Sequence, residues 1–249
     1  MLLASAALAL TLCAGRAPAY VVVVDPGHGG DQEGALSPSG EREKDLALAI
    51  ARRTASRLKK AGVKVVLTRT GDISVPLANR AAVANALRAD LFLSIHLNSM
   101  PTAEQRRTHA GVETYFLSAD ASDASATAVA ARENADRLAG EPVADPDDPV
   151  AAILDDLQDQ ASLDGASRLA YALHDRLVEL LGAEDHGVKQ APFYVLAGAR
   201  MPAVLLELGF ISHPEESAKL RDPAYQDRIA AAIVEGVTAF RAQARRGGR

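Results

Sequence analysis

Apolar runs alternate with amphipathic segments along most of the chain. The β-branched run at 20–25 (YVVVVD) stops at Pro26-Gly27 and is typical of a strand buried on both faces of a parallel sheet. Residues 41–61 carry apolar side chains at helical spacing and stop at Gly62, which predicts a helix. Similar patterns predict further strands at 63–68, 91–96, 112–117, 193–196 and 203–207, and further helices at 77–89 and 225–241.

The repeated order of strand, helix and strand indicates the fold class. Parallel neighbours in a sheet need long crossover connections, and the predicted helices provide them. We therefore expect a single α/β domain over residues 20–249, with a mostly parallel central sheet flanked by helices on both faces. The sequence contains no internal repeat and no sign of a second domain.

One stretch interrupts this alternation. Residues 118–165 are rich in Ala, Asp and Ser, have three prolines near their middle, and are predicted to be inserted into the domain. Within them, Asp148 as cap and Pro149 at the first helical position predict a helix over 149–160. The simplest interpretation is a surface helix that docks on the core by one apolar face, formed by Val150, Ile153, Leu154 and Leu157.

The N-terminal segment has the features of a signal peptide. Residues 2–14 are almost wholly apolar, and Ala17-Pro18-Ala19 places small residues where a signal peptidase reads, although the usual positive charge at the start is missing. We expect cleavage of residues 1–19 and export to the periplasm or cell envelope. The apolar run is shorter than the roughly 20 residues that cross a bilayer, so we expect no stable membrane insertion. Cys13 leaves lipid attachment as an alternative, which the bulky Leu12 before it disfavours.

Composition and charge narrow the classes of function. The 249 residues are 48% hydrophobic and 24% charged, the profile of a globular domain, and their formal net charge is −5. Without a global positive field, nucleic acid is not an expected partner. A single cysteine forms neither an internal disulfide nor a cysteine-ligated zinc site, so a metal ion must be held by His, Asp or Glu. The nucleotide-binding glycine motifs and the G-x-S-x-G motif of serine hydrolases are absent.

Three titratable side chains follow or end predicted strands. They are His28, His96 and Glu207. Each has an ordinary structural explanation taken singly, but the carboxyl ends of parallel strands share one edge of the sheet, where ligands bind in open α/β folds. Glu207 ends an apolar strand, where a buried carboxylate is costly unless a metal, a donor or a proton compensates for it.

Glu43 is a fourth candidate. It lies in the first turn of the predicted helix after Gly29-Gly30 and is expected to return beside His28. Two imidazoles and one carboxylate with an open fourth position form the pattern of a hydrolytic zinc site. The alternative for Glu43 is a solvated helix start that complements the helix dipole. The remaining histidines are expected on the surface or in turns: His109, His174, His186 and His213.

Six phrases in this order resemble the zinc-dependent N-acetylmuramoyl-L-alanine amidases that trim bacterial peptidoglycan: VVVVDPGHGG, GEREKDLALAIA, VKVVLTRTGD, LANRAAVAN, ADLFLSIHLNS and PAVLLELGFIS. The resemblance implies that His28, Glu43 and His96 hold Zn²⁺ and that Glu207 is the catalytic glutamate. The expected reaction is hydrolysis of the amide between N-acetylmuramic acid and L-alanine in peptidoglycan, by a monomer. Two alternatives are a zinc peptidase that cuts the stem peptide and a non-catalytic wall-binding module.

The resemblance also bears on the insertion. Some members that separate daughter cells carry an inserted helix that covers the zinc and is displaced by a protein activator, and residues 118–165 lie where that insertion would be. An autoinhibitory role for this segment is therefore a hypothesis. Glu141 and Asp155 are the two acidic side chains considered for the open metal position in a closed state.

Overall fold

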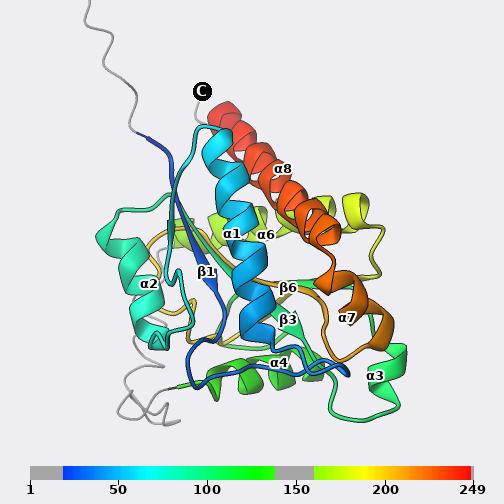
Figure 1. Cartoon of the computed structure of the whole chain (residues 1–249). Coiled ribbons are helices and arrows are strands. Elements are labelled where there is room, and N and C mark those ends of the chain that lie inside the picture. Colours follow the sequence, from blue (N-terminus) through cyan, green and yellow to red (C-terminus); the bar gives the residue numbers. More distant parts are fainter. Residues whose placement is uncertain (1–18, 138–159, 248–249) are drawn as a thin grey trace, which may run out of the picture.

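One six-stranded sheet forms the centre of the molecule. The computed structural model describes residues 19–137 and 160–247 (Figure 1). The strand order is β2-β1-β3-β6-β4-β5, and all neighbouring strands run parallel except β4 and β6, which run antiparallel. The strands are β1 (Val21–Pro26), β2 (Lys64–Leu67), β3 (Leu91–Asn98), β4 (Val112–Leu117), β5 (Asp185–Ala191) and β6 (Ala203–Phe210).

Helices cover both faces of this sheet, as predicted. Those in the described residues are α1 (Glu43–Lys60), α2 (Leu77–Ala86), α3 (Gln105–Thr108), α4 (Ala124–Asn134), α6 (Gln160–Leu181), α7 (Pro214–Arg221) and α8 (Pro223–Gly247). The first face packs against α1, α6 and α8, whereas α2 and α4 lie on the second. Figure 1 shows α4 at the same end of the molecule as α3 and the first turn of α1. Among the described helices, none combines the length and the apolar character needed to cross a membrane.

The central strands β1, β3 and β6 are buried on both faces. Val22, Leu93 and Leu206 belong to the core on the first face, and the adjacent residues Val23, Phe92 and Leu205 belong to the core on the second. A parallel sheet covered by helices on both sides needs apolar side chains in both directions, which explains the continuous aliphatic runs. Full burial of such a side chain contributes about 1.5–3 kcal/mol to the stability of the fold, so these three strands form its stable centre.

The prediction of a strand at 193–196 is wrong. This stretch is a turn, in which the Leu196 and Ala197 amides donate to the Phe193 carbonyl at 3.1 and 3.2 Å. Phe193 and Val195 are apolar because they pack into the second core from a loop. The strand next to it, β5, has the polar sequence DHGVKQA because it lies at the edge of the sheet, where most of its side chains are partly exposed.

The two faces differ at the edge of the sheet where β1, β3 and β6 end and the antiparallel β4 begins. On the first face the side chains stay apolar to the end, as Leu97 and Leu208 show. On the second face the buried positions become polar: Asp25, Ser94, His96, Asn98, Glu113 and Glu207. His96 is in register with Glu207 across β3 and β6, and Glu207 with Glu113 across β6 and β4. The fold thus gathers a row of buried polar groups at one end of one face.

A candidate metal centre at the carboxyl end of the sheet

The structure brings His28, Glu43 and His96 together and adds Glu133 to them. Each of these four buried residues offers one ligand atom, and the four atoms lie within 4.8 Å of one another. His28 Nε2 is 2.9 Å from Glu43 Oε1, and His96 Nδ1 is 2.8 Å from Glu133 Oε2. The ligand atoms come from the loop after β1, the first turn of α1, the end of β3 and the last turn of α4.

The atoms at the centre of this cluster lack hydrogen-bond partners. His28 Nε2, His96 Nδ1 and Glu133 Oε2 are buried, and their short contacts do not have hydrogen-bond geometry. Buried polar atoms in proteins almost always have a hydrogen-bond or metal partner. Three unpaired polar atoms that converge on one place therefore indicate a partner that all three share. Imidazole nitrogens and carboxylate oxygens are the donors that zinc prefers when thiolates are absent. The residues present therefore fit a divalent cation.

The loop that carries His28 is fixed by two buried arginines. His28 adopts the left-handed conformation with φ of 57°, which is uncommon outside glycine. Arg80 donates to the carbonyls of His28 and Pro26 at 2.9 and 2.8 Å, and Arg69 donates to that of Gly27 at 2.6 Å. Two guanidinium groups thus hold three successive carbonyls, and through them the position of the His28 side chain.

Two glycines let the side chains of the candidate metal centre approach the backbone. A Cβ atom on Gly27 would lie 2.5 Å from Cε1 of His96. A Cβ atom on Gly34 would lie 2.6 Å from Cδ2 of His28 and 2.7 Å from Cβ of Glu43, and Gly34 also has a φ of 68°. All three distances are shorter than real Cβ contacts, so these two positions accept only glycine without movement of the site.

Glu43 is held as a carboxylate by the backbone. The Leu97 amide donates to Oε1 at 2.8 Å and the Ala35 amide to Oε2 at 2.9 Å. Burial raises the pKa of Glu43, but the neighbouring His28 and His96 outweigh it and hold this pKa well below its ordinary value. Glu43 is 1% exposed, so the alternative of a solvated helix start is wrong.

The two imidazoles are surrounded by negative charge. Burial alone lowers the pKa of His28, but the Glu43 carboxylate and a hydrogen bond with Asp136 at 2.9 Å hold it well above its ordinary value. In the same way Glu133 outweighs burial and raises the pKa of His96 to about 9. Metal ligands must be deprotonated, so cation binding at this cluster is coupled to release of protons.

Glu207 lies beside the cluster on β6. It is fully buried, its Oε2 has no hydrogen-bond partner, and its Oε1 is 3.4 Å from Nη2 of Arg132. Burial, followed by the charge of Glu133, raises the pKa of Glu207 well above its ordinary value. The strands of His96 and Glu207 continue to Asn98 and Phe210, so these side chains face the site from within their strands and do not end them.

Sequence reasoning missed Glu133. The acidic candidates Glu141 and Asp155, together with the predicted helix over 149–160, lie outside the described residues. Glu133 belongs to α4, which Asp123 caps by accepting from the Ala126 amide at 2.7 Å. The sequence does contain a pattern that predicts α4 and places Glu133 on its buried face. Three apolar residues and then a carboxylate follow one another at helical spacing: Ala126, Val129, Ala130 and Glu133.

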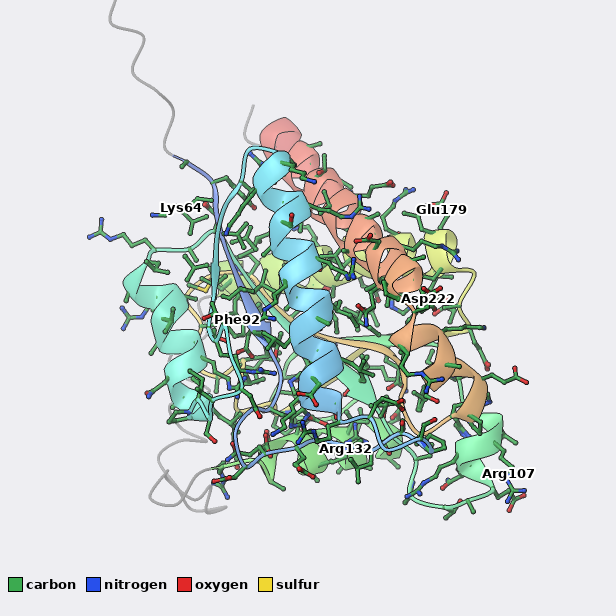
Figure 2. All side chains as sticks on the ribbon, in the orientation of Figure 1. Lys64, Phe92, Arg107, Arg132, Glu179 and Asp222 are labelled. Carbon is green, nitrogen blue, oxygen red and sulfur yellow. The ribbon has the colours of Figure 1, made fainter. Side chains whose placement is uncertain are left out.

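Arg132, next to Glu133, ties α4 to the end of β3. Its Nε donates to Oε1 of Glu133 at 2.9 Å, its Nη1 to the Ser99 carbonyl at 2.9 Å and its Nη2 to Oδ1 of Asn98 at 3.1 Å. Figure 2 places Arg132 below the first turn of α1. The surrounding carboxylates outweigh burial and raise the pKa of Arg132, so a permanent positive charge balances part of this acidic cluster.

The other histidines lie elsewhere. His174 was expected near the surface, but it is buried and contacts Thr114 at 3.1 Å and Asp185 at 2.8 Å. His213 accepts from the Glu216 amide at the start of α7. His109 contacts the Gln105 carbonyl of its own turn, and His186 contacts the Ala110 carbonyl before β4.

Comparisons with known proteins show which family this chain is similar to. A family model described as N-acetylmuramoyl-L-alanine amidase matches residues 22–239. The amidase AmiA of Escherichia coli (strain K12) is 36% identical over 222 residues, which cover 88% of this chain and 75% of AmiA. The amidase AmiC of Neisseria meningitidis is 34% identical over 91% of this chain and 53% of AmiC.

Solved structures give the same result. The N-acetylmuramoyl-L-alanine amidase from Clostridium difficile 630 superposes with a TM-score of 0.68 and 31% identity, over 89% of this chain and 96% of that one. The catalytic domain of CwlV, an amidase from Bacillus (Paenibacillus) polymyxa, gives 0.67 and 30% over 89% and 97%. With the family model matching most of its length, this chain belongs to the N-acetylmuramoyl-L-alanine amidases, enzymes that hydrolyse an amide bond of peptidoglycan.

Proposed function

We propose that the amidase activity of this chain depends on a zinc ion held by His28, Glu43 and His96. The observation that carries this proposal is the convergence of buried nitrogen and oxygen atoms from three separate elements, of which the two nitrogens have no hydrogen-bond partner. Zinc in such a site supplies a Lewis acid for the scissile carbonyl and lowers the pKa of a water molecule that it binds. The bond cleaved is the amide between N-acetylmuramic acid and L-alanine.

In this proposal Glu207 is the general base. Its free Oε2 lies next to the cluster in a dry environment that raises its pKa, which brings the group closer to the pH at which it must take up and return a proton. Oε2 takes a proton from the attacking water and then passes it to the nitrogen of the leaving L-alanine. The ligands and the base are all present in one site, which disfavours a non-catalytic wall-binding module.

The test is digestion of purified peptidoglycan by the zinc-loaded full chain, with and without a chelator. We expect intact glycan strands and stem peptides that begin with a free L-alanine amine, identified by mass spectrometry, and no release after chelation. Fragments cut inside the stem peptide would instead assign the chain to the peptidase alternative. Release that survives complete removal of the metal would exclude a metal-dependent mechanism.

We further propose that α4 is the inhibitory part of the 118–165 insertion. A catalytic zinc site keeps one position open, whereas four protein ligands make a closed, structural site. Glu133 Oε2 lies 2.8 Å from His96 Nδ1, where it would occupy that position. Arg132 on the same turn contacts Glu207, so one helix end engages both the metal site and the base.

An activator protein that displaces α4 would therefore free both groups at once. The alternative is that Glu133 is a permanent ligand of the working enzyme. The two interpretations predict opposite signs for Glu133→Gln, since removal of an inhibitory ligand raises basal activity and removal of a working ligand lowers it. The variant is assayed on peptidoglycan together with its zinc content.

We also propose that this chain is exported to the periplasm or cell envelope. Peptidoglycan lies outside the cytoplasm, and the apolar stretch with Ala17-Pro18-Ala19 provides a leader that would be removed on the way. N-terminal sequencing of the protein recovered from the cell envelope is expected to give Tyr20 as the first residue. Retention of residues 1–19 on a lipid-modified Cys13 would favour the anchored alternative.

A further inference from the structure

Three cavities meet at one side chain, Arg106 of α3. The first, of about 680 Å³, opens beside His28, Glu43 and Glu133. The second, of about 310 Å³, lies between the segment after β3 and the outer side of α4. The third, also of about 310 Å³, runs past Leu36 toward the start of α7. Arg106 lines all three and therefore stands where the space around the candidate metal centre continues outward.

The guanidinium of Arg106 is oriented but not neutralised. Its Nε donates to the Met100 carbonyl at 2.7 Å, which fixes the plane of the group and leaves both Nη atoms for other contacts. Within residues 19–137 and 160–247, no carboxylate forms an ion pair with it. Arg132, the other cation of the first cavity, is engaged by Glu133 and by groups at the end of β3.

The rest of the first cavity is acidic. Its wall includes Asp31, Glu33 and Asp136 in addition to Glu43 and Glu133. Asp31, Glu33 and Glu43 lie outside α4 and stay on this wall when α4 is displaced, so beyond the metal ion itself Arg106 is the place where a carboxylate of the substrate would be attracted. A planar guanidinium with two free nitrogens binds a carboxylate by two parallel hydrogen bonds, which fixes orientation as well as position.

We propose that Arg106 forms a subsite for a carboxylate of the stem peptide, beyond the amide that is cleaved. The inference rests on the proposed function, because it takes the peptide side of the scissile bond to lie in the first cavity. Stem peptides continue from L-alanine into residues that carry free carboxylates, and an extended peptide advances about 3.3–3.6 Å per residue. Binding of one such carboxylate at Arg106 would orient the peptide so that its first amide faces the metal centre.

The test uses three synthetic peptides and the zinc-loaded full chain, in which every protein compared, including the one called wild type below, carries Glu133→Gln so that the proposed block by α4 is relieved. The parent is L-alanyl-γ-D-glutamyl-L-lysine, and each of two analogues has one of its two carboxyl groups replaced by a carboxamide. Dissociation constants are measured by calorimetry for wild type, Arg106→Ala and Arg106→Lys. Arg107→Ala is the matched control, because Arg107 is the next residue of α3, is also exposed and lines only the third cavity. Figure 2 shows Arg107 on α3, at the same end of the molecule as Arg132.

We expect Arg106→Ala to weaken binding of the parent peptide by about tenfold to a hundredfold, the usual loss for a hydrogen bond to a charged group. Arg106→Lys keeps the charge without the planar fork and should give an intermediate loss. One carboxamide analogue should bind wild type as weakly as the parent binds Arg106→Ala, with no further loss in that variant. Arg107→Ala should leave all three constants unchanged.

Equal losses for all three peptides in Arg106→Ala, or the same loss in Arg107→Ala, would overturn the subsite and leave only a general positive field. Unchanged binding in Arg106→Ala would overturn it as well. Peptide binding is measured without turnover, so this test is independent of the amidase activity. If Arg106→Ala selectively weakens peptide binding but the chain does not digest peptidoglycan, the proposed function is wrong and the carboxylate site is kept. The melting temperature of each variant checks that the fold is kept.

Discussion

Two helices, α1 and α4, each deliver one glutamate to the same cluster, but they are attached to the molecule in different ways. Apart from Glu43, α1 buries large aliphatic side chains in the core on the first face, among them Leu46, Ile50 and Leu58. The apolar residues that α4 buries beside Glu133 are small: Ala126, Val129 and Ala130. Full burial of a Leu or Ile contributes about 1.5–3 kcal/mol, so α1 is a fixed part of the fold.

The attachment of α4 depends instead on polar contacts. Arg132 donates to Ser99 and Asn98, and Asn134 exchanges hydrogen bonds with the Pro192 carbonyl and the Tyr194 amide. The net contribution of one such hydrogen bond is about 0.5–1.5 kcal/mol, because water or a partner protein offers nearly equivalent bonds. On the proposal that α4 is inhibitory, the same carboxylate chemistry is thus built once into a permanent helix, α1, and once into a removable helix, α4.

The largest expected effect comes from the permanent helix. Glu43→Gln removes a carboxylate that receives two backbone amides, and we expect complete loss of activity and a fall in zinc affinity of roughly a thousandfold, as for a broken buried ion pair. Zinc content by plasma mass spectrometry and folding by circular dichroism check the result. A folded Glu43→Gln protein with a full complement of zinc would remove Glu43 from the site.

Glu207 lies on β6 of the sheet between the two helices. Its substitution should separate the binding of zinc from the chemical step. Glu207→Gln keeps the shape of the side chain but does not accept a proton, so we expect turnover to fall by about 10²–10⁴-fold. Zinc content should stay at the wild-type level. A loss of less than tenfold would mean that another group is the base.

The matched substitution on the removable helix should have the opposite sign. Glu133→Gln is expected to raise basal hydrolysis of peptidoglycan by about tenfold to a hundredfold, because it weakens the closed state by roughly 1.4–2.8 kcal/mol. Zinc should remain bound through the other three residues. If activity falls together with zinc content, Glu133 is a ligand of the working enzyme. The proposal that α4 is inhibitory is then wrong.

The smallest effect should come from the apolar attachment of α4. Val129→Ala removes two methyl groups from its contact with the second core, each worth about 0.8 kcal/mol, and we expect basal activity to rise by about tenfold, the lower limit of the range for Glu133→Gln, with unchanged zinc content. Proteolysis of the 118–165 segment should become faster. Unfolding of the whole domain by Val129→Ala would show that α4 is part of the structural core.

Much of the site followed from the sequence because its fixed half lies on strongly patterned elements. His96 and Glu207 lie within aliphatic runs that become central strands, and Glu43 follows a glycine-rich turn. The aliphatic runs are easy to recognise in the sequence because a strand that is buried on both faces of the sheet needs apolar side chains in both directions. The expected convergence of His28 with them then follows from the shared edge of parallel strands.

The removable half was harder to predict for the same physical reason. A helix that is held by alanines and polar contacts has a weak apolar stripe, so α4 and its Glu133 did not stand out. The polar edge strand β5 lacked an aliphatic signal, while the buried turn at 193–196 imitated one. In each case the missing information was the tertiary environment, which decides whether an apolar residue belongs to a strand or to a loop.

The paired arginines under the His28 loop also bear on the order of assembly. Arg80 is joined to the fully buried Asp25 at 3.0 Å, and Arg69 additionally donates to the Lys44 carbonyl at the start of α1. The strained turn is therefore held by protein groups alone, in contrast to small zinc domains, in which metal binding drives folding. Under the zinc dependence proposed above, the chain completes its fold first and acquires the metal ion afterwards, so metal supply would set when the enzyme becomes active and not whether it stays folded.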